Sequence, residues 1–85
     1  MSKSNAYYNK PLLIKLLKDC DYEYYELNEH QIRVMGATHI IDIWPARMTC
    51  HRISGESISS KEDYFRLSYY FNEAEVKKLL DSGEL

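Results

Sequence analysis

The apolar positions near the start of the chain follow a helical period. An apolar stripe recurs there at intervals of three and four residues: Leu13, Leu16, Leu17 and Cys20. This spacing places side chains on one face of a helix. Asn9 can cap the first turn, and Pro11 then lies inside that turn, where its missing N–H costs little. We therefore expect a helix over residues 10–20, with residues 1–8 frayed in front of it.

The middle of the chain has the period of β-strands. Between residues 22 and 53, aromatic and β-branched side chains alternate with polar ones, which is typical of strands with one buried face. Turn-forming pairs interrupt the alternation at three places: Asn28-Glu29, Gly36-Ala37 and Pro45-Ala46. The pattern therefore predicts four strands joined by two-residue turns, at residues 22–27, 31–35, 38–44 and 47–53.

Residues 63–71 can be interpreted in two ways. Aromatic and apolar side chains alternate there with other residues up to Phe71, which favours a fifth strand. Ser59 and Glu62, just before, have the spacing of a capping box, which favours a helix. We expect the strand, because aromatic residues are enriched in strands and the alternation is unbroken.

A second helix is predicted at the end of the chain. Asn72 and Glu75 form another capping-box pattern, and Gly83 sits where a C-terminal cap is expected. An apolar stripe lies between these two signals: Ala74, Val76, Leu79 and Leu80. We expect a helix over residues 73–82.

The predicted turns also fix the two faces of the sheet, because directly opposed residues in neighbouring strands share a face. The three turns agree on one apolar face, made of Tyr25, Leu27, Ile32, Val34, Ile41, Ile43, Met48 and Cys50. Glu23 and His39 fall at the rim of that face. The opposite face collects aromatic, charged and polar residues: Tyr22, Tyr24, Glu26, Gln31, Arg33, Ile40, Asp42, Trp44, Arg47, Thr49 and His51.

These elements define the expected fold class. A chain of 85 residues is long enough for one domain with a modest core, so we expect a single domain over residues 1–85. The class is α+β: an antiparallel sheet of four or five strands, with an N-terminal and a C-terminal helix packed on one face.

The charge distribution offers a second candidate site. The net charge of −2 argues against bulk attraction to nucleic acid. Residues 19–29 contain five carboxylates and no Lys or Arg. Three of these, Asp19, Asp21 and Glu23, form a candidate acidic patch that could dock a basic surface or simply be a solvated edge.

Catalysis and metal binding find little support in the sequence. A structural zinc site needs paired ligands at short spacing, whereas Cys50 and His51 are neighbours that point to opposite faces of a strand. Cys50 is expected in the core, where a thiol is inert. Asp42 and His51 could pair as acid and base on one face, but no third group completes a site. We expect no enzyme activity, no metal and no cofactor.

Localisation follows from the cysteines and the hydropathy. Two cysteines without a signal-peptide pattern suggest free thiols in a reducing cytoplasm. No apolar run approaches the roughly 20 residues needed to cross a bilayer, so we expect no membrane association.

The outward face of the predicted sheet is the candidate binding site. Tyr, Trp and Arg dominate interface hot spots, so this face predicts a protein partner. The candidate contact residues are Tyr22, Tyr24, Arg33, Asp42, Trp44, Arg47 and His51. Single-stranded nucleic acid is an alternative, since aromatic rings lie beside cations, but Asp42 and Glu26 in the same patch oppose it. A homodimer that buries this face is the other alternative.

One motif resembles a pattern in small orphan proteins of tailed bacteriophages. Their hairpin pattern, (I/V)-D-(F/I/V)-(W/Y)-P, is matched by Ile41-Asp42-Ile43-Trp44-Pro45. The similar region spans residues 28–53, about a third of the 85 residues. Those proteins usually continue with Thr-Thr-Gly, whereas this chain continues with Ala46-Arg47-Met48. The resemblance implies a phage protein that binds, and inhibits, a host or defence protein in the host cytoplasm.

Overall fold

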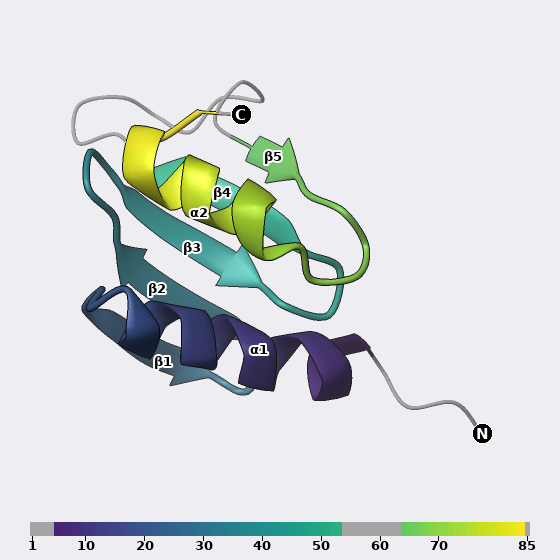
Figure 1. Ribbon diagram of the computed structural model, residues 1–85. Helices are drawn as coiled ribbons and strands as arrows, with labels where there is room; N and C mark the ends of the chain where they lie inside the picture. The colour runs from purple at the N-terminus through teal and green to yellow at the C-terminus, as the bar shows by residue number, and fades with distance from the viewer. Residues whose placement is uncertain (1–4, 54–63, 85) are drawn as a thin grey trace.

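The computed structural model describes residues 5–53 and 64–84 (Figure 1). Two helices lie on one face of a five-stranded antiparallel sheet, whose strands neighbour one another in chain order. This arrangement confirms the expected α+β class. The elements are α1 (Asn5–Asp19), β1 (Tyr24–Asn28), β2 (Gln31–Met35), β3 (Ile40–Trp44), β4 (Thr49–Ile53), β5 (Tyr64–Arg66) and α2 (Glu73–Ser82).

Helix α1 begins earlier than the sequence predicts. It starts at Asn5, so residues 5–8, expected to be frayed, are helical, while residues 1–4 lie outside the described part. Asn9 is therefore not the cap, and Pro11 lies inside the helix rather than in its first turn. The prediction was wrong because a fully buried Asn9 uses its side chain for hydrogen bonds to distant segments instead of to its own helix.

The turns that flank β3 are four residues long, not two. Arg33 therefore pairs with Asp42, and Ile43 pairs with Cys50, each displaced by two positions from the predicted register. Because side chains alternate with period two, a shift of two leaves every face assignment of these strands unchanged. Met48 lies in the second turn with a φ of 51°, yet it remains buried, so it contributes to the core from a turn.

Strand β1 has the opposite faces from those predicted. A bulge lies between Glu26 and Asn28, and the turn is formed one residue later than expected. The Oδ1 atom of Asn28 accepts a hydrogen bond from the backbone N–H of His30 at 2.7 Å, which holds the turn in this later position. The resulting shift of one residue pairs Tyr24 with Val34 and Tyr25 with Arg33.

This shift corrects five face assignments, since Glu26 also moves from the outward face to the helix side, where it pairs with Lys10 of α1. Tyr22 and Tyr24 pack against the core on the helix side of the sheet, not on the outward face. Tyr25 and Leu27, predicted to be buried, are 49% and 45% exposed. Strand β1 is thus the most exposed of the first four strands.

The core lies between the two helices and the sheet. Each helix contributes three buried side chains, and most of the remainder come from alternate positions of β2, β3 and β4. Its members are Leu13, Leu16, Leu17, Ile32, Val34, Ile41, Ile43, Met48, Cys50, Leu67, Val76, Leu79 and Leu80. Burial of these side chains supplies most of the stabilisation of a domain this small.

The C-terminal region follows the sequence in outline. The predicted strand over residues 63–71 is reduced to the three residues of β5, and the rival Ser59–Glu62 cap lies outside the described residues. Helix α2 is confirmed. Asn72 accepts a hydrogen bond from the N–H of Glu75 at 3.1 Å, and Gly83 ends the helix with a φ of 77°. The Glu75 carboxylate does not close the capping box, because it accepts the N–H of Ser68 instead.

Candidate binding site on the open face of the sheet

The face of the sheet opposite the helices is the candidate site. No helix or strand within residues 5–53 and 64–84 covers it, and we call it the open face (Figure 1). Its residues are ordered in three rows that run across the strands. The central row is Tyr25, Arg33, Asp42, His51 and Tyr64. An apolar row beside it contains Met35, Ile40 and Ile53, and an outer row contains Trp44, Thr49 and Arg66.

Asp42 is the anchor of the central row. It is only 3% exposed although it lies on the open face. The Nε and Nη2 atoms of Arg33 donate to its two carboxylate oxygens at 2.9 and 3.1 Å, and Gln31 Nε2 donates at 2.8 Å. This bidentate pairing satisfies a buried charge that would otherwise be costly. The hydrogen bonds that Arg33 donates to Asp42 raise the pKa of Arg33, so the guanidinium stays charged beside the carboxylate.

His51 lies directly opposite Asp42 but does not bond to it. Its ring stacks on Tyr64, with centroids 4.2 Å apart and planes inclined by 8°. The Nε2 atom of His51 is buried and has no hydrogen-bond partner. Asp42 is already occupied by Arg33 and Gln31, so the pair does not form the acid–base arrangement that the sequence raised.

The outer row ends in a basic corner. Trp44 is half-buried at the end of β3, and the N–H of Arg47 donates to its carbonyl at 3.2 Å in the turn that follows. Arg66 lies across from Thr49, which itself pairs with Trp44. Arg47 and Arg66 are exposed, and within the described ranges neither forms an ion pair. This end of the face therefore carries two arginines without an ion pair in the described ranges, one in the turn after Trp44 and one on β5.

The structure brings together four of the seven predicted contact residues. Arg33, Asp42, Trp44 and His51 lie on the open face, and Arg47 lies at its margin. The remaining two are the tyrosines that the β1 shift moves to the helix side. Sequence reasoning missed Tyr25, Met35, Ile53, Tyr64 and Arg66 as members of the face.

Tyr22 has a structural role on the helix side. Its hydroxyl donates a hydrogen bond to Asp81 of α2. Burial, with a contribution from this hydrogen bond, raises the pKa of Tyr22 to about 12. The side chain therefore links the segment before β1 to the C-terminal helix and is not available for a partner on the open face.

The predicted acidic patch is a series of exposed carboxylates along one edge of the molecule. Asp19 pairs with Lys15 of the same helix at 3.0 Å, and Glu23 accepts a hydrogen bond from the hydroxyl of Tyr25 at 2.8 Å. Asp21 has a φ of 63° in the turn after α1. Internal partners for two of the three favour the solvated-edge interpretation.

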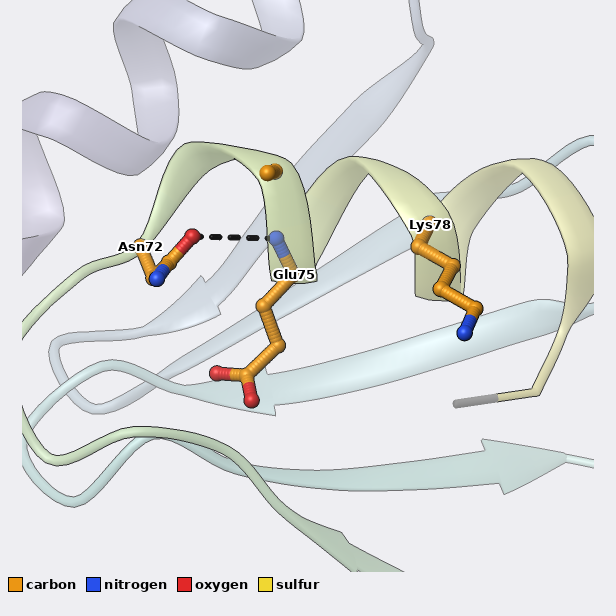
Figure 2. Close-up of a pocket in the computed structure, with 4 residues that line it drawn as sticks. Asn72, Glu75 and Lys78 are labelled. Atoms are coloured by element: carbon orange, nitrogen blue, oxygen red, sulfur yellow. Dashed lines mark hydrogen bonds between the residues drawn. The ribbon is translucent and has the colours of Figure 1, made fainter.

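A shallow pocket lies on α2, lined by Asn72, Ala74, Glu75 and Lys78 (Figure 2). Asn72 and Glu75 both serve the local structure, as the helix cap and as the acceptor for Ser68. Of the four residues that line the pocket, Lys78 is therefore the one whose polar group has no such structural role.

The reactive residue types elsewhere do not assemble into a site. In the described part of the chain, no three His, Cys, Asp or Glu side chains come together in a way that could hold a metal ion. Burial raises the pKa of the Cys50 thiol, which keeps it protonated and unreactive at neutral pH. Both cysteines are free.

In comparisons with known proteins, no family model, no curated protein sequence and no solved structure matches the chain. As for membranes, neither helix of the described ranges has the length and apolar character required to cross one.

Proposed function

We propose that this chain is a non-catalytic protein-binding module that holds its partner against the open face. The observation that carries this proposal is the exposure of large side chains there. Tyr25 and Tyr64 are each 49% exposed and Ile40 is 37% exposed, on a face that also presents Arg33 and Trp44. Such residues contribute most of the binding energy in protein interfaces.

The kind of partner is proposed from the sequence. The hairpin around Trp44 resembles those of small phage proteins, so a host or defence protein that the chain inhibits is the first candidate. Two free thiols fit a reducing compartment such as the host cytoplasm.

Two features of the open face support a binding role over catalysis or nucleic-acid recognition. Asp42 accepts three hydrogen bonds from Arg33 and Gln31, whereas the ring of His51 stacks on Tyr64 and its Nε2 atom has no hydrogen-bond partner. The same contact neutralises Arg33, so the centre of the face offers no net positive charge to phosphates.

The test is affinity capture from a bacterial lysate with the immobilised protein. We expect one protein to be retained in near-equimolar amount, and Ile40→Lys on the open face to abolish its retention. Tyr70→Ala is the control, because Tyr70 is more exposed than Tyr25, Tyr64 or Ile40 but lies in the segment before α2. Both variants must first show the wild-type circular dichroism spectrum.

Two results would reject this function. If Ile40→Lys retains the same protein as strongly as the wild type, the open face is not the site. If sedimentation shows a stable dimer that Ile40→Lys converts to monomer, the face is occupied by a second copy, as in the homodimer alternative.

A further inference from the structure

Positive charge on the open face is concentrated at the end that carries Trp44. Asp42, the only buried charged residue among those that the structure describes, is paired with Arg33 in the central row. Arg47 and Arg66 remain at the Trp44 end, without an ion pair in the part of the chain that the structure describes. The uncompensated charge of this end is therefore positive, although the whole chain carries −2.

The opposite end of the open face is apolar. Met35, Ile40 and Ile53 lie side by side there, one from each of β2, β3 and β4. Ile40 and Trp44 are the first and last residues of β3, so the apolar row and the basic corner are separated by about 13 Å along the strand. A partner that covers the whole face must therefore present different chemistry at each end.

Carboxylates on the molecule itself constrain the orientation of that partner. Asp21 and Glu23 are exposed beside β1, whereas Arg66 lies on β5 at the far edge of the sheet. A negatively charged surface is repelled by the first edge and attracted to the second, which orients its approach.

We infer that the partner presents an acidic protein surface, whose carboxylates pair with Arg47 and Arg66 around Trp44 while a neighbouring apolar side chain covers Ile40. This inference rests on the proposed function and specifies the partner's chemistry. Protein carboxylates fit better than nucleic-acid phosphates, because the row of Met35, Ile40 and Ile53 gives a phosphate backbone nothing to bind. An acidic surface with an apolar anchor uses both ends of the face.

The direct test uses synthetic peptides and the fluorescence of Trp44, the sole tryptophan. The probe is a capped peptide with four glutamates, a two-glycine spacer and four alternating leucines and phenylalanines. A second peptide carries lysines in place of the glutamates, and a ten-residue oligothymidine serves as the phosphate probe. We expect only the first peptide to change the Trp44 emission in a saturable manner, with an affinity that falls as salt is added.

A charge-reversal pair isolates the basic corner. Arg47→Glu/Arg66→Glu should weaken binding of the acidic peptide about tenfold or more, since two rim ion pairs become repulsive. Lys18→Glu/Lys78→Glu makes the same change of net charge on the exposed surfaces of α1 and α2 and should bind as the wild type does. Equal binding by both double variants, equal binding of the lysine peptide, tighter binding of the oligothymidine, or no response to any probe would each overturn the inference.

The proposed function can fail separately from this inference. If the captured protein is lost with Ile40→Lys but kept with Arg47→Glu/Arg66→Glu, the open face binds a partner whose acidic character is refuted. If both variants keep it, the open face itself is rejected.

Discussion

Asn9 in α1 donates a hydrogen bond from its side-chain amide to the carbonyl of Pro45, 36 residues further along the chain, at 2.8 Å. The same amide also donates to the carbonyl of Tyr69 at 3.0 Å, and its oxygen accepts the N–H of Phe71 at 2.9 Å. One fully buried side chain therefore joins α1, the turn after β3 and the segment before α2. It positions the turn that carries Arg47, at the margin of the open face.

Replacing Asn9 should be among the most damaging single changes in this chain. Asn9→Ala leaves three backbone groups without their partners, and each such group in a buried site costs about 1–3 kcal/mol. We expect the free energy of unfolding, measured by urea denaturation, to fall by about 3 kcal/mol or more. Asn28→Ala, at an exposed turn, is the matched control and should cost about 1 kcal/mol or less. A loss for Asn9→Ala no larger than that of the control would contradict this role.

The Arg33–Asp42 pair should be strongly coupled. Arg33→Leu leaves a carboxylate that is almost wholly buried without its main partner, which we expect to cost about 2–3 kcal/mol. In Arg33→Leu/Asp42→Leu no unpaired charge remains, so much of this loss should be recovered. A double-mutant cycle by urea denaturation measures the coupling. Additive effects of the two single changes would show that the pair is not a unit.

The sequence correctly predicted which side chains of β2, β3 and β4 lie on the open face, although it predicted the wrong pairing registers. Both turn-length errors around β3 were even, and an error of two residues does not move a side chain from one face to the other. In β1 the error was one residue, which reversed Tyr24 and Tyr25. The bulge responsible depends on tertiary pairing with β2, and its only local signal is the Asn28 side chain that bonds to His30.

The two helices show the same contrast between local signals, which the sequence reveals, and long-range contacts, which it does not. Asn72 and Gly83 act through their own helix, so their roles could be inferred from neighbouring residues. Asparagine is common at helix caps, but the side chain of Asn9 forms hydrogen bonds with backbone groups 36 to 62 residues further along the chain. No local pattern contains that information.

The two cysteines should react very differently with a thiol reagent. Cys50 is fully buried and its pKa is raised by desolvation, with a further contribution from the nearby Glu75 carboxylate. Cys20 is only partly buried. We expect one thiol per chain to react with Ellman's reagent in the native state and two in urea, and Cys20→Ser to abolish the native reaction. Fast modification of Cys50 in the folded Cys20→Ser variant would show that the core opens readily.

Stability at alkaline pH should depend on Tyr22. Its pKa is raised from 10.0 to about 12 in the folded protein, so the folded state favours the neutral hydroxyl that donates to Asp81. A raised pKa contributes stability that is fully present below pH 10 and is lost as the pH rises through about 12. The stability of the wild type relative to Tyr22→Phe should therefore be greatest below pH 10 and should decline between pH 10 and 12.

Differences between variants isolate this effect, because other tyrosines and the lysines titrate in the same range. The measurement is the urea midpoint of each variant from pH 8 to 12, with Tyr70→Phe as a control for loss of an exposed hydroxyl. Asp81→Asn removes the carboxylate that disfavours ionisation, so it should shift the alkaline loss of stability toward lower pH. A difference between the wild type and Tyr22→Phe that stays constant across the whole range would mean that folding does not raise the pKa of Tyr22.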